Sequence, residues 1–170
     1  MAGKYFMTGR PGCGKTTLLK KAVEKVRLKH GFLTEEVVDG GKRRGFKIID
    51  SYGRSALMAS KETGGDVRVG SFKVFKEVLD EFSEGLKEIP KGALLYIDEV
   101  GPMEIKSEKF QNLILDFLES ENLFIGTIHQ KSDDLFIRII KEMEGIEMIE
   151  ITNENRDQIT TAIKAMFDEK

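Results

Sequence analysis

Residues 9 to 16 read GRPGCGKT and fit the pattern G-x-x-x-x-G-K-[ST]. Glycines at the spacing of Gly9, Gly12 and Gly14 let the backbone fold tightly with its N–H groups turned inward, and such donors bind polyphosphate oxygens. Lys15 is long enough to reach the β- and γ-phosphates, and the Thr16 hydroxyl is a ligand for Mg²⁺. The residue types therefore predict a phosphate-binding loop, with Lys15 acting in catalysis as well as in binding.

This chemistry requires a strand before the motif and a helix after it. An apolar run at residues 5–7 predicts the strand, and residues 18, 19, 22, 23 and 26 are apolar at helical spacing. The motif would then precede a helix N-terminus, where the helix dipole favours bound anions. A chance glycine-rich turn is the alternative interpretation, and it would need neither flanking element.

A pair of acids follows the continuous apolar run at residues 93–97. In a P-loop protein, an acid after a buried strand occupies the Walker B position, so we expect Asp98 to hold Mg²⁺ together with Thr16. Glu99 is then placed to orient and deprotonate a water in line with the γ-phosphate. The alternative is that both acids begin a solvated loop.

The stretch from Asp98 to Gly101 also fits the D-x-x-G pattern of GTPase switches. Two observations oppose that class. Pro102 stands where those proteins usually carry the glutamine that positions water, and no N-K-x-D guanine-binding motif occurs in the chain. We therefore expect loose selectivity for the base.

Several other polar residues have both a functional and a plain interpretation. His129 follows the apolar run at 123–128 and either contacts the γ-phosphate or is a half-exposed loop histidine. Arg43 and Arg44 lie at a predicted hairpin tip, where they either stabilise transition-state charge or are simply solvated. Arg156 either stacks on the base or forms an ion pair at a helix start.

Two further residues within the motif, Arg10 and Cys13, are considered separately. Arg10 is a further candidate for phosphate contact, and Cys13 is expected to be a small filler rather than a reactive thiol. Cys13 is the only cysteine, which excludes an internal disulfide. The full nucleotide-binding set that we expect is Gly9, Arg10, Pro11, Gly12, Cys13, Gly14, Lys15, Thr16, Thr17 and Arg156.

The remaining patterns predict an α/β fold with a mostly parallel sheet. Apolar runs at 93–97, 123–128 and 148–151 alternate with helical patterns at 75–86, 110–118, 135–143 and 159–167. Strand patterns at 32–38, 46–50 and 56–59, separated by glycine turns, predict an antiparallel meander after the first helix. Residues 61–70 lack periodicity and are expected to be a loop. In such folds ligands bind at the carboxyl ends of the strands.

The 170 residues are 40% hydrophobic and 33% charged, as expected of a single globular domain spanning 1–170. The net charge of −2 gives no electrostatic case for nucleic acid or an anionic membrane as partner. No apolar stretch approaches a membrane span, and the first strand leaves no room for a signal peptide. We expect a cytoplasmic monomer.

Combined, the motifs resemble the thermophilic-type nucleoside-triphosphatase family, whose members include the cancer-related nucleoside-triphosphatase. The resemblance spans almost the whole chain, and IDEVGPME at 97–104 is its most specific part. It implies a three-layer, RecA-like P-loop domain that hydrolyses ATP, GTP, CTP, UTP and TTP slowly to diphosphates. In the stretch VGSF at 69–72, the glycine is followed by serine, where a lysine is expected in many relatives. We therefore do not assign to this chain any basic contact that the family makes at that position.

Two other functions fit the same motifs. A nucleotide or small-molecule kinase would transfer the phosphate to an acceptor rather than to water. A nucleotide-gated binding module would use slow hydrolysis only to reset a switch, with the segments at 42–44 and 61–70 as its moving parts.

Overall fold

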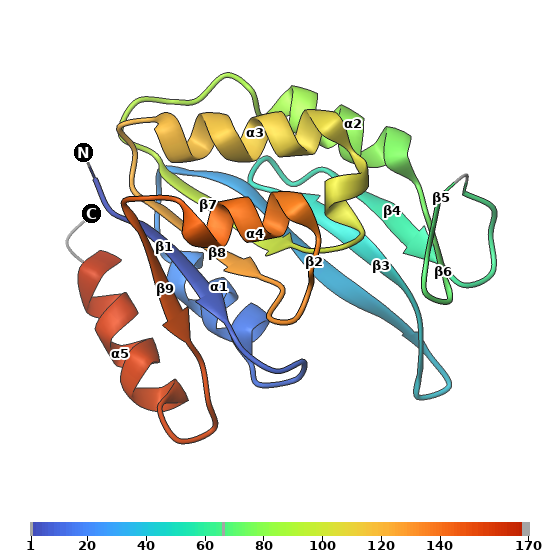
Figure 1. The fold of residues 1–170 in the computed structure, drawn as a ribbon, viewed down its shortest axis with the longest axis horizontal. Helices are drawn as coiled ribbons and strands as arrows, with labels where there is room; N and C mark the ends of the chain where they lie inside the picture. The colour runs from blue at the N-terminus through green and yellow to red at the C-terminus, as the bar shows by residue number, and fades with distance from the viewer. Residues whose placement is uncertain (1, 66, 168–170) are drawn as a thin grey trace.

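A computed structural model describes residues 2–65 and 67–167 as an α/β fold built on one mixed sheet (Figure 1). The nine strands of these residues lie in the order β5-β6-β4-β3-β2-β7-β8-β1-β9. The α/β class agrees with the sequence prediction. The sheet is not mostly parallel as predicted, because four of the strand pairings among these residues are parallel and four are antiparallel.

The parallel half of the sheet holds four strands that pair in register. Met7 on β1 lies beside Thr127 on β8 and beside Ile149 on β9, and Ile97 on β7 lies beside Gly126. All four run in the same direction, so their carboxyl ends meet at one edge. Their bounds are β1 Lys4–Thr8, β7 Leu94–Val100, β8 Phe124–Ile128 and β9 Ile146–Glu150.

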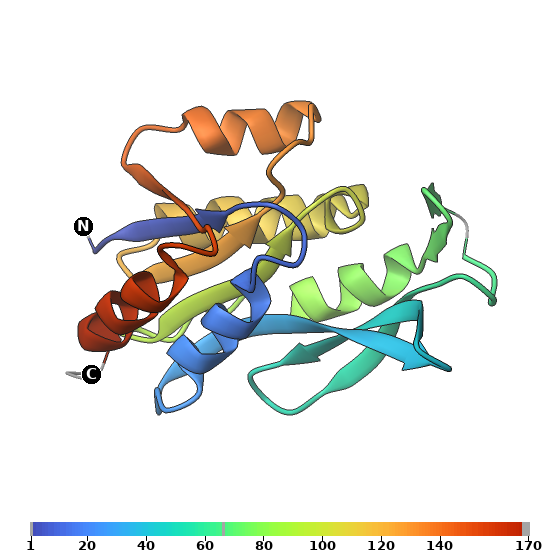
Figure 2. The same ribbon diagram turned by 90° about the horizontal axis from the view of Figure 1, so that it is seen from below.

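Helices cover both faces of this parallel half, because their apolar stripes pack into two separate clusters of buried residues. α1 (Lys15–Val23) and α5 (Arg156–Phe167) pack on one face, against side chains such as Met7 and Tyr96. α2 (Lys76–Gly85), α3 (Glu108–Glu119) and α4 (Leu135–Glu142) pack on the other face. Figure 2 shows α1 and α5 on one side of the sheet and α4 on the opposite side.

The antiparallel half differs from the predicted meander in two ways. β2 (Lys29–Asp39) pairs antiparallel with β3 (Lys42–Asp50), but its first residues also pair parallel with β7. One strand therefore joins the two halves. The antiparallel pairing also extends beyond β4 (Ser55–Ser60), because β6 (Phe72–Val74) pairs with β4.

The predicted loop at 61–70 is wrong in part, because β5 (Val67–Val69) lies within it and pairs with β6. Each strand has three residues, too few to carry a readable period in the sequence. Gly70, at φ +58°, forms the turn between them in a conformation that favours glycine. The β2–β3 hairpin projects beyond the rest of the sheet (Figure 1).

One short element follows β7 and shapes the site. Residues Glu104–Lys106 form a 3₁₀ turn, η1, which returns the chain towards α3. Among the described residues, no helix is both long and apolar enough to cross a bilayer.

Candidate active site

The phosphate-binding motif lies between β1 and α1, at the carboxyl edge of the sheet. Gly14 precedes α1 with φ +96°, a backbone conformation that residues other than glycine rarely adopt. The first turn of α1 carries no acidic residue, and no side chain caps its N–H groups. These donors and the helix dipole are therefore available to an anion.

The start of the loop is fixed by close packing. A Cβ on Gly9 would lie 2.6 Å from the carbonyl oxygen of Ile151 and 2.8 Å from Cys13 Sγ, so only glycine fits there. The Lys15 ammonium donates to the Gly9 carbonyl at 2.8 Å. Lys15 is thus folded back over its own loop, close to the phosphates' expected position.

Asp98 is a buried carboxylate held by three threonine hydroxyls. Thr127 donates to Oδ1 at 2.7 Å, Thr16 donates to the same oxygen at 3.3 Å, and Thr34 donates to Oδ2 at 3.4 Å. Burial raises the pKa of Asp98, and the hydrogen bonds from the threonines oppose part of that rise. The structure therefore brings Thr16 and Asp98 together, although Asp98 lies within β7 rather than after it.

Glu99 follows Asp98 on β7 and is closely approached by a third acid, Glu104 of η1. An atom in the Cβ position of Gly101 would lie 2.8 Å from Glu99 Oε1 and 3.0 Å from Glu104 Oε2. Burial and the charge of Asp98 raise the pKa of Glu99, while Lys15 lowers it. Burial and the charge of Glu99 raise the pKa of Glu104 well above its usual range. Glu99 is the more exposed of the two.

His129 follows β8 at the same edge, and its backbone N–H donates to the Val100 carbonyl at 3.1 Å. Its Nδ1 is buried without a hydrogen-bond partner in the described part of the chain. Burial, Lys15 and Lys141 all lower the pKa of His129, which favours a neutral imidazole. The structure thus places His129 near Lys15, in the region expected for the γ-phosphate.

Arg156, the first residue of α5, lies against the phosphate-binding loop. Its Cδ is 3.0 Å from the position that a Cβ on Gly14 would occupy. A cavity of about 450 Å³ lies two residues before Arg156 along the chain, between residues 10–13 of the loop and residues 150–154 at the end of β9. Its size and position suit the base and sugar of a nucleotide.

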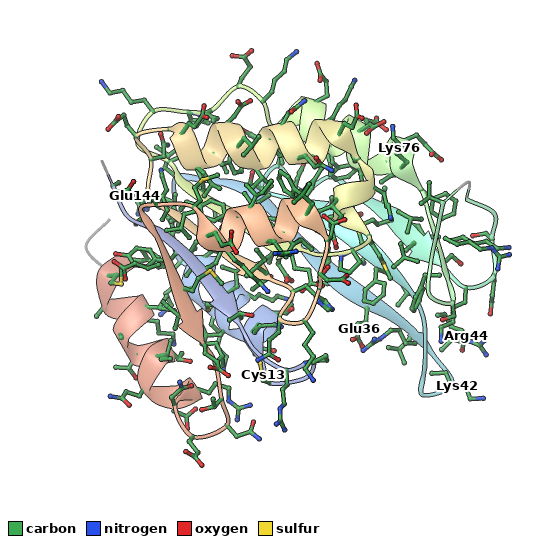
Figure 3. The ribbon with its side chains drawn as sticks, in the orientation of Figure 1. Cys13, Glu36, Lys42, Arg44, Lys76 and Glu144 are labelled. Atoms are coloured by element: carbon green, nitrogen blue, oxygen red, sulfur yellow. The ribbon has the colours of Figure 1, made fainter. Side chains whose placement is uncertain are left out.

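The remaining predicted residues fall into two groups. Arg10, Pro11 and Thr17 are exposed around the loop, whereas Cys13 is buried and packs against Gly9, as expected of a small filler. Figure 3 shows Lys42 and Arg44 at the far end of the β2–β3 hairpin, away from Cys13.

Both hairpin arginines have acidic partners in the structure. Arg43 pairs with Glu36 at 2.5 Å, and Arg44 pairs with Glu62 at 3.3 Å. The structure therefore does not bring them to the phosphate-binding loop.

Two residues near the site, Thr34 and Thr127, were not singled out in the sequence, and Glu104 was noted only as the last residue of IDEVGPME. Thr127 is the one hydroxyl in the apolar run at 123–128, and a buried hydroxyl needs a hydrogen-bond partner. The sequence could therefore have indicated Thr127 as a residue with a polar partner. For Thr34 the sequence alone gives no comparable indication, because its partner Asp98 lies on another strand. The motif at 97–104 includes Glu104 but does not show that it lies close to Glu99.

Known proteins resemble the chain along nearly its full length. "Nucleoside-triphosphatase THEP1" of Thermotoga petrophila is 38% identical over 165 residues, covering 94% of this chain and 90% of its own. The protein of the same name from Methanocaldococcus jannaschii is 36% identical over 162 residues, covering 92% of each chain.

Two solved structures share the fold. The crystal structure of THEP1 from the hyperthermophile Aquifex aeolicus superposes with a TM-score of 0.85 at 33% identity, covering 97% of this chain and 99% of that one. The solution structure of a human cancer-related nucleoside triphosphatase gives a TM-score of 0.81 at 26% identity, covering 99% of both. The resemblance predicted from the motifs is thereby confirmed. Since the profile of the family described as "NTPase" also matches residues 4–164, the chain belongs to that family.

Proposed function

We propose that this protein is a Mg²⁺-dependent nucleoside-triphosphate phosphohydrolase, which converts NTP and water to NDP and phosphate with little preference among bases. The observation that carries the proposal is the 3.3 Å hydrogen bond between Thr16 and Asp98, with Glu99 next in the chain. This arrangement gathers a phosphate loop, a cation ligand and a base at one edge of the sheet. The names of the relatives support the same reaction.

The donor set of Thr16 and Asp98 fits Mg²⁺. This ion prefers one or two carboxylates, with phosphate oxygens and waters completing its octahedron. Asp98 is buried, and three threonine hydroxyls donate hydrogen bonds to its carboxylate. When bound, Mg²⁺ would neutralise charge on the β- and γ-phosphate oxygens.

Glu99 is the proposed general base. Its raised pKa makes it a stronger proton acceptor, and it lies one residue from the cation ligand. Glu99 orients a water and takes its proton as the water attacks the γ-phosphorus. Lys15 leaves the Gly9 carbonyl and, with the main-chain N–H groups of the loop, stabilises the charge that develops on the phosphate oxygens.

The cavity between residues 10–13 and residues 150–154 is the proposed site of the base and sugar. Arg156 covers the phosphate-binding loop, and the chain contains no N-K-x-D motif that would read guanine. These features support weak base selectivity. We further propose a single RecA-like P-loop domain, because all strands of the described residues form one sheet.

The test is phosphate release from ATP, GTP, CTP, UTP and TTP, with and without Mg²⁺, in wild type and in Glu99→Gln. We expect Mg²⁺-dependent release from all five, and a Glu99→Gln variant that binds nucleotide but turns over at least ~10²-fold more slowly. Wild-type turnover in the variant would overturn the role of Glu99. Release only in the presence of a phosphate acceptor would indicate a kinase, and a large acceleration by a protein partner would indicate a gated module.

A further inference from the structure

Lys141, near the end of α4, has an unusual position for a lysine. It is half-buried, and its ammonium donates to the carbonyl oxygen of Gln130 at 2.8 Å. Gln130 belongs to the loop that leaves β8. The lysine thus points to the carboxyl edge of the sheet rather than into solvent.

The sheet register brings this loop to the phosphate-binding loop. β8 lies beside β1, and Met7 pairs with Thr127, so the chain leaves both strands at the same level. Gly9 follows Met7 by two residues and holds the Lys15 ammonium on its carbonyl. The two lysines are therefore bound to main-chain carbonyls of neighbouring loops. Consistent with this, burial lowers the pKa of Lys141, and the charge of Lys15 lowers it further.

The charge of Glu99 acts on Lys15, but neither lysine is paired directly with a carboxylate in the described residues. His129 Nδ1 and Gln130 Oε1 are also buried without hydrogen-bond partners in that part of the chain. Unpaired buried polar atoms cost free energy, so this corner is suited to a polar occupant, and the two lysines favour an anionic one. Gln130 Oε1 is an acceptor, so a water or another donor, not the anion itself, would satisfy it.

The position along a bound nucleotide follows from the order of the strands. The cavity beside residues 150–154 lies on the β9 side of β1, whereas β8 and β7 lie on its other side. A nucleotide with its base in that cavity and its β-phosphate in the loop would direct its γ-phosphate towards β8. There it meets Asp98, Glu99 and the loop that holds Lys141.

We propose that Lys141 is a second phosphate-binding cation, which leaves the Gln130 carbonyl and contacts the γ-phosphate of a bound triphosphate. The proposal rests on the proposed function of the site. A lysine stem has several rotatable bonds, so its ammonium can move from the carbonyl to a nearby phosphate oxygen. Lys141 would then make the site bind triphosphates more tightly than diphosphates. It would also stabilise the charge of the transition state from within the same chain.

The test compares the binding of ADP with that of a non-hydrolysable β,γ-imido analogue of ATP, each with Mg²⁺, in wild type and Lys141→Met. A hydrogen bond between charged groups predicts a loss of about tenfold or more in affinity for the analogue. We expect the affinity for ADP to stay within about twofold, since ADP lacks the γ-phosphate. Lys141→Arg should recover most of the loss, and Arg138→Met, at an exposed cation of the same helix, should change neither affinity.

A second measurement needs no variant. Acetylation of the Lys141 amine in the wild-type protein, followed by mass spectrometry, should be slowed by the ATP analogue but not by ADP. Equal protection by both ligands, or equal loss of both affinities in Lys141→Met, would overturn the proposal. The hydrolysis assignment fails separately: wild type that releases no phosphate would overturn it while leaving the binding comparison valid.

Discussion

Thr127 donates a 2.7 Å hydrogen bond to the Oδ1 of Asp98, and both residues are buried in the centre of the sheet. The bond crosses from β8 to β7, while Thr34 reaches the other carboxylate oxygen from β2 at 3.4 Å. The orientation of Asp98 is therefore fixed by two neighbouring strands before any cation binds. Partners of this kind behind a metal ligand commonly control the affinity of the metal.

Thr127→Val tests this relationship, because it removes the hydroxyl while nearly keeping the shape. We expect the Mg²⁺ concentration for half-maximal turnover to rise about tenfold, and the free energy of unfolding to fall by ~1–3 kcal/mol. A magnesium titration of phosphate release and urea unfolding measure the two effects. Thr127→Ser, which keeps the hydroxyl, is the control. An unchanged Mg²⁺ requirement in Thr127→Val would show that the bond does not position Asp98.

Gly101→Ala is predicted to displace the carboxylate of Glu99, the proposed general base. The new Cβ would lie 2.8 Å from Glu99 Oε1, and the backbone of Gly101 is outside the left-handed region, so alanine adds no strain there. Since a misplacement of about 1 Å can cost ~10²-fold in rate, we expect a loss of that order in kcat with little change in nucleotide affinity. Steady-state kinetics measure the change in kcat, and equilibrium binding measures the change in nucleotide affinity.

The matched control is Gly64→Ala, at a glycine whose Cβ position has no neighbour within 4 Å. This variant should retain wild-type kcat. If Gly101→Ala also retained it, the carboxylate of Glu99 would have room to move without loss of function, and its observed position would not be required for turnover.

Glu104 makes stability depend on pH in a direction opposite to that of most carboxylates. Its pKa in the folded protein lies well above 4.5, because it is buried beside Glu99. Between these two pKa values the folded state keeps a proton that the unfolded state loses, so the free energy of unfolding falls as pH rises. Within that pH range, a single group lowers the free energy of unfolding by about 1.4 kcal/mol for each pH unit.

Glu104→Gln removes this titration while keeping the shape of the side chain. We expect the decline in the free energy of unfolding between pH 5 and pH 8 to be smaller than in wild type, with the variant more stable at pH 8. Part of the decline should remain, because the pKa values of Glu99 and Asp98 are also raised. Urea unfolding without Mg²⁺ measures it, with exposed Glu119→Gln as the control. Parallel pH profiles in wild type and Glu104→Gln would contradict the assignment.

The parts of the fold that the sequence predicted have strong local signals. The motif at 9–16 predicts a turn, the apolar residues on either side of it predict the strand and the helix, and the apolar runs of β7 and β8 are long enough to be read as buried strands. The strand β5 has only three residues, and the parallel pairing of β2 with β7 joins residues 65 positions apart, such as Lys29 and Leu94. Neither feature leaves a periodic pattern in the sequence.

The same distinction separates the predicted site residues from those that were missed. Lys15, Thr16 and Asp98 belong to motifs whose chemistry is tied to spacing. Thr34 and Lys141 gain their importance only from the register of neighbouring strands and the placement of α4, which no local pattern encodes. Such supporting residues become visible only when the distances between elements are known.

Asn155 offers a test of the opposite end of the nucleotide. Its Oδ1 accepts from the backbone N–H of Thr152, and its Nδ2 donates to the Glu150 carbonyl, both at 2.8 Å. These bonds hold together the loop that lines the cavity beside the phosphate-binding loop. Asn155→Ala removes both and leaves the loop free to move, so we expect nucleotide affinity to fall by about tenfold, the value of roughly one net hydrogen bond.

This loss should be the same for ADP and for the β,γ-imido analogue of ATP, because the loop lies on the β9 side of the site, away from the γ-phosphate. The pattern differs from that of Lys141→Met, and calorimetric titration with both ligands distinguishes them. Asn153→Ala changes an exposed residue of the same cavity without breaking either bond of Asn155. If Asn153→Ala weakened binding more than Asn155→Ala, direct contact with the nucleotide, rather than the shape of the loop, would determine affinity at this end.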